Sequence, residues 1–165
     1  MQYARVFEMT QLDKIILTLS ATCILPVLVH LIPFFAADIG RYWLPIFYAP
    51  LVAALCFRPQ VAITASLLGP MVNHALLRMP SYPEAQFLTS ELMIFSAVIL
   101  ILRKFFKPQG WAVILAFIFA NAVSSSIFWH TDWAAIGQGV AHCWPGLLAL
   151  VILTEGVNYL RKENA

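Results

Sequence analysis

Polar side chains that could bind a solute or move a proton recur inside the apolar stretches of this chain. The set contains three histidines, two asparagines and one acid: His30, Asn73, His74, Glu91, Asn121 and His142. A polar group in hydrocarbon is costly unless another helix or a cavity satisfies it, so such residues at membrane depth point to function. Together they offer hydrogen-bond donors and acceptors of the kind that hold a small polar solute.

The spacing of these residues argues against a metal centre and against bond chemistry. His142 and Cys143 are neighbours and would point about 100° apart on a helix, and no histidine has a second ligand four residues away. Glu91 has no nucleophile with a matching partner at a recognisable spacing. We therefore expect no resident metal or cofactor and no enzymatic activity.

The composition places these residues in a membrane protein. Of the 165 residues, 61% are hydrophobic and 11% are charged, and the mean hydropathy is +0.81. Soluble domains carry about 25% charged residues. At about 20 residues per crossing, the chain holds at most about six spans. A soluble catalytic lobe, an ATPase cassette and a nucleic-acid-binding module are therefore excluded within it. Cys23, Cys56 and Cys143 form no CxxC pair, which indicates buried thiols.

Hydropathy and helix breakers predict an all-α bundle of six transmembrane helices with both termini in the cytoplasm. The expected spans are 15–35, 42–57, 60–77, 87–102, 111–128 and 138–160. The connections at 36–41, 78–86 and 129–136 then lie on the outer side. The first span is too long for a signal-peptide core, so we expect it to be retained.

The distribution of Lys and Arg predicts the orientation. Two basic residues, Arg41 and Arg78, fall on the outer side. The eight on the inner side are Arg5, Lys14, Arg58, Arg103, Lys104, Lys107, Arg161 and Lys162. This asymmetry satisfies the positive-inside rule. All six polar candidates then lie in the outer half of the membrane, where they would line a cavity open to the outside. The alternative is that each only bonds one helix to another.

Several short motifs follow one another between residues 44 and 92. They are Leu44-Pro45 with Pro50, Gly69-Pro70-Met71-Val72-Asn73-His74, Met79-Pro80 with Pro83, and Glu91-Leu92. In this order they resemble the substrate-binding (S) component of energy-coupling factor (ECF) vitamin transporters. Trp144-Pro145-Gly146 is similar to the Pro-Gly start of that family's sixth span.

The resemblance implies a membrane protein that captures a vitamin or related metabolite from the outer side and delivers it inward. We assign seven residues to the substrate: Asn73, His74, Glu91, Asn121 and His142 as polar contacts, and Tyr48 and Trp144 as stacking surfaces. The implied partners are the ECF transmembrane coupling subunit and its ATPases, in the bacterial cytoplasmic membrane.

Two alternatives stay open at this point. The first span offers Thr18, Ala21 and Thr22 in place of the Ala-xxx-Ala row with which many S components meet the coupling subunit, so a solitary S component is one of them. In cobalamin-type solitary members a cysteine can be a metal ligand, and no local pattern selects Cys56 or Cys143 for that role. The other alternative is a membrane scaffold of MreD-like topology that binds other membrane proteins.

Overall fold

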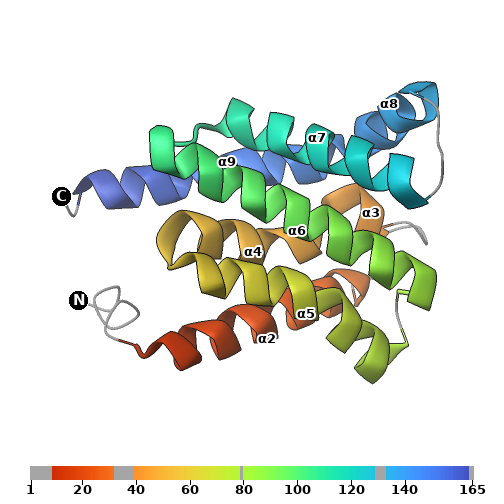
Figure 1. Cartoon of the computed structure of the whole chain (residues 1–165), viewed down its shortest axis with the longest axis horizontal. Coiled ribbons are helices and arrows are strands. Elements are labelled where there is room, and N and C mark those ends of the chain that lie inside the picture. Colours follow the sequence, from red (N-terminus) through yellow and green to blue (C-terminus); the bar gives the residue numbers. More distant parts are fainter. Residues whose placement is uncertain (1–8, 32–38, 79, 129–132, 164–165) are drawn as a thin grey trace.

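The fold is helical throughout the part of the chain that the structure, a computed structural model, describes. That part comprises residues 9–31, 39–78, 80–128 and 133–163. The helices are α2 (Gln11–His30), α3 (Ile39–Trp43), α4 (Pro45–Cys56), α5 (Pro59–Leu77), α6 (Tyr82–Phe105), α7 (Gly110–Phe128), α8 (Trp133–His142) and α9 (Trp144–Glu163). Figure 1 shows the long helices side by side, with α3 and α8 in the half of the bundle away from the marked termini.

The chain is a multi-pass helical membrane protein by the length and apolar character of its helices. Helices α2, α5, α6 and α7 are each long and apolar enough to cross a membrane, and the bent pair α8–α9 would be a fifth span. Helix α4 is apolar but has 12 residues. It is therefore about 18 Å long, short of the roughly 30 Å hydrocarbon core.

Helix α6 begins earlier than the sequence predicts, so the expected loop at 78–86 is shorter. Glu84 Oε2 accepts hydrogen bonds from the Ser81 backbone N–H at 3.0 Å and from Ser81 Oγ at 2.8 Å. This capping box starts the helix, and Pro83 fits in its first turn because the N–H groups there need no helical partner. Pro83 therefore belongs to the first turn of α6 and not to the preceding loop.

The expected second and sixth spans are both interrupted. The second breaks at Leu44, which has left-handed backbone angles (φ 52°, ψ 40°) directly before Pro45. The sixth, expected to be continuous over 138–160, breaks at Cys143, where α8 and α9 meet at 64°. Pro45 directly follows Leu44 and disfavours the helical conformation there, whereas Pro145, the second residue of α9, lacks the N–H that would continue the helical hydrogen bonds from α8.

The two breaks lie against each other. A Cβ added at Gly146 would stand 2.7 Å from the carbonyl carbon of Trp43 and 2.8 Å from its oxygen. Only glycine can therefore let the start of α9 approach the junction of α3 and α4 this closely.

An aromatic cluster fills the middle of the bundle. Phe47 on α4 meets Phe95 on α6 and Phe117 on α7, edge to face, with both pairs of ring centroids 5.3 Å apart. All three side chains are buried, as is most of α4. The short helix is therefore the centre of the bundle, and the longer helices surround it.

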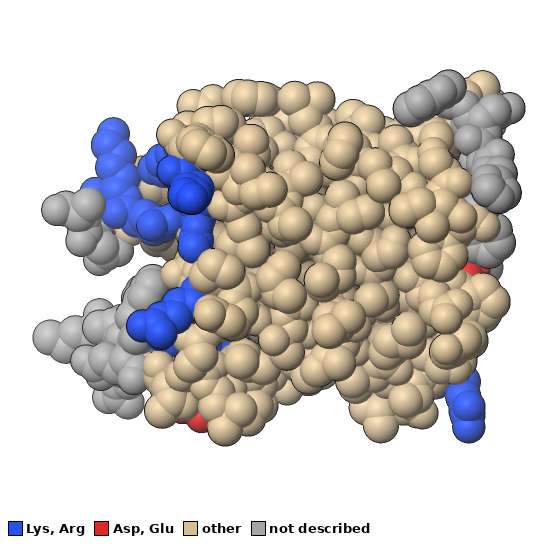
Figure 2. Space-filling view, in the orientation of Figure 1, with Lys and Arg blue, Asp and Glu red and all other residues tan. Residues whose placement is uncertain are grey.

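Basic residues gather at the end of the bundle where α2 begins and α9 finishes (Figure 2). The described ones are Lys14, Arg58, Arg103, Lys104, Lys107, Arg161 and Lys162. Arg78, at the end of α5, lies at the opposite end. We name these the basic end and the far end. The separation is the one that the positive-inside count predicts, although Arg5 and the Arg41 side chain fall outside the described part.

Candidate functional site

The predicted site residues that the structure brings into direct contact are Glu91 and Asn121. Asn121 Nδ2 donates a hydrogen bond to Glu91 Oε1 at 2.8 Å, joining α6 to α7. Glu91 is 3% exposed. A buried carboxyl group is costly without polar partners, so the amide of Asn121 helps to hold it within the bundle.

Serines extend this polar contact between the helices. Ser90 Oγ lies 2.9 Å from Ser124 Oγ, again between α6 and α7. Nearer the basic end, Ser66 Oγ on α5 lies 2.7 Å from Ser96 Oγ on α6. These pairs fix the rotation and register of α5, α6 and α7 around the Glu91–Asn121 contact.

Asn73 has a buried acceptor without a hydrogen-bond partner among the described residues. The side chain is 3% exposed, and Oδ1 is the atom concerned. Because α5 and α6 are antiparallel and paired at Ser66 and Ser96, residue 73 lies level with about residue 89. Asn73 is thus within about one helical turn of Glu91 along the bundle axis. An unsatisfied buried acceptor costs about 1–3 kcal/mol, which a bound donor would recover.

The aromatic cluster closes the bundle below these polar residues. Phe95 follows Glu91 by one turn of α6, and Phe117 precedes Asn121 by one turn of α7. Both turns lead toward the basic end. The polar layer formed by Asn73, Glu91 and Asn121 therefore rests on packed rings and lies in the half of the bundle nearer the far end.

Two more predicted residues belong to the contact between the broken helices. The Tyr48 hydroxyl donates a hydrogen bond to the Trp43 carbonyl oxygen across the break before α4. The His142 ring, at the end of α8, meets the Tyr42 ring edge to face at 5.5 Å. Tyr48 and His142 are thus joined to the same junction that Gly146 packs against.

His74 and Trp144 lie outside the polar layer. His74 Nδ1 lies 2.9 Å from the Pro80 carbonyl oxygen, and its ring is 5.6 Å from that of Tyr82. This side chain therefore ties the end of α5 to the start of α6. Trp144 is 59% exposed. His30 is also exposed, and its Nδ1 lies 2.7 Å from the Pro26 carbonyl oxygen in its own helix.

Over the described ranges, no group of three or more His, Cys, Asp or Glu is placed to hold a metal ion. Cys23, Cys56 and Cys143 form no disulfide with one another. They stand on different helices, α2 and α4, and at the break between α8 and α9. Cys56 lies at the basic end, away from the polar layer.

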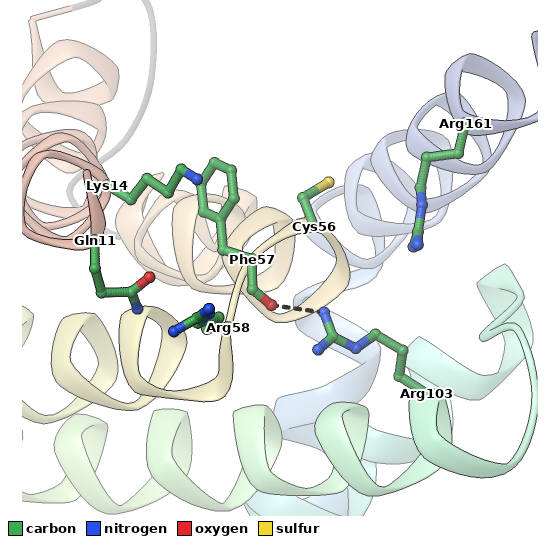
Figure 3. Close-up of a pocket in the computed structure, with 7 residues that line it drawn as sticks. All are labelled: Gln11, Lys14, Cys56, Phe57, Arg58, Arg103 and Arg161. Carbon is green, nitrogen blue, oxygen red and sulfur yellow. Dashed lines mark hydrogen bonds between the residues drawn. The ribbon is translucent and has the colours of Figure 1, made fainter. Parts of the chain in front are cut away.

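A cavity of about 470 Å³ opens at the basic end (Figure 3). This cavity was not predicted from the sequence. Its lining residues are Gln11, Lys14, Cys56, Phe57, Arg58, Arg103 and Arg161. A neighbouring cavity of about 450 Å³ shares Arg103 and Arg161 and adds Phe106, Lys107, Pro108 and Lys162. The sequence does hold a signal for this cavity, because basic residues stand at the ends of separate spans. That pattern was used only to predict the orientation in the membrane.

Comparison with known proteins yields no match: no family model, no curated protein and no solved structure matches the chain.

Proposed function

We propose that the chain is a membrane-embedded substrate-binding protein of the S-component type, which takes up a vitamin or a related small metabolite from the side of the far end. The observation that carries this proposal is the buried polar layer of Asn73, Glu91 and Asn121. It holds a carboxyl group, an amide and an unpartnered acceptor on three adjacent helices. An ionisable residue between transmembrane helices is costly to bury, and such residues mark substrate and ion pathways in membrane proteins.

The broken helices support the same function. In many transporters the substrate site is formed by discontinuous transmembrane helices, because the break frees backbone groups for binding. Here two breaks, at Leu44 and Cys143, meet through Gly146 and Trp43 in the half of the bundle nearer the far end. Tyr48 and His142 lie at this junction, which is about level with the polar layer and would form one side of the substrate site.

The polar layer suggests the chemistry of the ligand. The Asn73 oxygen needs a donor, and the Glu91 carboxyl group accepts as well. A heterocycle with N–H or O–H groups would satisfy both. In the bacterial cytoplasmic membrane, the protein would deliver this ligand inward either together with ECF-type coupling subunits or without them.

Native mass spectrometry of the purified protein tests this proposal. We expect a small molecule to co-purify, and a panel of water-soluble vitamins to contain a compound that raises the melting temperature. Glu91→Gln and Asn73→Leu should each weaken binding of that compound by about tenfold or more, because Asn73→Leu removes an acceptor and Glu91→Gln replaces one carboxylate oxygen by an NH2 donor. His74→Ala should weaken it less, since His74 contacts Pro80 and Tyr82.

The matched control is Ser96→Ala, which removes a buried interhelical hydrogen bond from the same helix, nearer the basic end. It should leave affinity unchanged. Unchanged affinity in Glu91→Gln and Asn73→Leu would remove this site. A stoichiometric protein partner without any small molecule would instead favour the scaffold function.

A further inference from the structure

Four basic side chains from separate helix ends surround the cavity at the junction of α4 and α5 (Figure 3). Lys14 comes from α2, Arg58 precedes α5, Arg103 comes from the last turn of α6, and Arg161 comes from α9. Among the described residues that line the cavity there is no Asp or Glu. The lining is therefore strongly cationic.

The two central arginines are held close together by one backbone oxygen. Arg103 Nη1 lies 3.1 Å from the Leu55 carbonyl oxygen and 2.8 Å from that of Phe57. Arg161 Nη1 donates to the same Leu55 oxygen at 3.0 Å. Two guanidinium nitrogens that share an acceptor are at most about 6 Å apart, so the like charges repel. Each guanidinium carries five N–H donors, and the two carbonyls use only some of them.

Gln11 adds an independent sign that an acceptor belongs in this cavity. Its Nε2 atom is buried and has no hydrogen-bond partner in the described part of the chain. The amide lines the same cavity as the arginines. Guanidinium and amide N–H groups are all donors, so a ligand with several anionic oxygens, such as a phosphate group, would satisfy them together.

The surroundings favour a lipid as the source of that phosphate. Leu12 and Ile16, on α2 beside Gln11 and Lys14, are 64% and 54% exposed. Phe105 and Phe106, beside Arg103, are 75% and 44% exposed. A soluble anion gains nothing from exposed apolar side chains, whereas acyl chains pack against them. Basic pockets between transmembrane helices on the cytoplasmic side bind lipid headgroups in this way.

We propose that the cavity at the basic end binds the headgroup of an anionic phospholipid, with Arg103 and Arg161 on its phosphate and Gln11, Lys14 and Arg58 around it. The acyl chains then lie along the exposed side chains of α2 and of the end of α6. The neighbouring cavity, with Lys107 and Lys162, extends the cationic surface for a larger headgroup. This site is separate from the polar layer, so it stands or falls independently of solute binding.

Native mass spectrometry of the full chain in mixed micelles of phosphatidylglycerol and phosphatidylcholine tests the proposal. The unaltered protein should retain phosphatidylglycerol preferentially. Each basic side chain near the membrane surface contributes about fivefold, so Arg103→Gln with Arg161→Gln should lower retention by about 25-fold. The charge-matched control, Arg78→Gln with Lys104→Gln, changes two residues outside both cavities and should retain the lipid.

A second variant guards against loss of fold, because Arg103 and Arg161 also bond the end of α4. Arg58→Gln leaves both contacts with Leu55 in place and should lower retention by about fivefold. Equal retention by Arg58→Gln, the arginine pair variant and the control would overturn the proposal. So would equal retention of phosphatidylcholine, and so would full displacement of the lipid by millimolar inorganic phosphate, which would identify a soluble anion.

Discussion

The two ends of the bundle hold polar groups in different ways. At the basic end, long cationic side chains reach back from helix ends and bond backbone carbonyls, as Arg103 does with Leu55 and Phe57. At the far end, short polar side chains lie between helices, and the helices themselves are interrupted at Leu44 and Cys143. A cation on a long side chain can remain near water while it closes the bundle. A short amide or acid has no such freedom, so it needs a partner or a ligand inside.

The largest change in stability is expected when two glycines of α9 are compared. Gly146→Ala would push a methyl group against the Trp43 backbone, which cannot move aside cheaply. We expect it to lower the free energy of unfolding by about 3 kcal/mol. Gly156→Ala, with nothing within 4 Å of the added carbon, should raise it by up to about 1 kcal/mol through helix propensity. Unfolding in mixed micelles with dodecyl sulfate measures both, and equal stabilities would show that the broken helices are not tightly packed.

A somewhat smaller loss is expected at the basic end. Arg103→Gln removes charge-assisted hydrogen bonds to the end of α4, so the free energy of unfolding should fall by about 2 kcal/mol. Lys104→Gln changes the same charge at the neighbouring exposed position and should alter it by less than about 0.5 kcal/mol. The same unfolding assay applies. A similar loss in both variants would mean that net charge, and not the contact with α4, stabilises this end.

The smallest effect concerns the neutral serine pairs. A double-mutant cycle of Ser66→Ala and Ser96→Ala should give a coupling energy of about 0.6 kcal/mol, the usual value for a hydrogen bond between transmembrane helices. The cycle for Ser90 and Ser124 should give a similar value. A coupling near zero for the second pair alone would indicate that water reaches the polar layer and competes for these hydroxyls.

Helices bounded by strong breakers were predicted well from the sequence. The expected spans 60–77 and 111–128 correspond to α5 (Pro59–Leu77) and α7 (Gly110–Phe128). In contrast, the breaks at Leu44 and Cys143 were missed because both residues are apolar, and hydropathy registers only composition. The conformation of Leu44 depends on Pro45, which follows it, and the junction of the two breaks depends on the close approach of Gly146 to Trp43.

For the candidate site, the sequence predicted how deep each residue lies along its helix but not which way its side chain points. Membrane topology placed Glu91 and Asn121 in the same half of the bilayer, yet their contact depends on how α6 and α7 rotate against each other. Rotation also separates neighbours in sequence. Asn73 and His74 differ by about 100° around α5, so one is buried and the other contacts Pro80. Packing decides which of two adjacent polar residues faces inward.

The shortness of α4 limits how far the centre of the bundle reaches across a membrane. This helix is roughly 18 Å long, whereas the hydrocarbon core of a bilayer is about 30 Å thick. The lower end of α4 is marked by the guanidinium groups at Leu55, and its upper end by the turn at Leu44. The central helix of the bundle therefore covers little more than half of the hydrocarbon thickness, and the remainder is spanned by the longer helices around it.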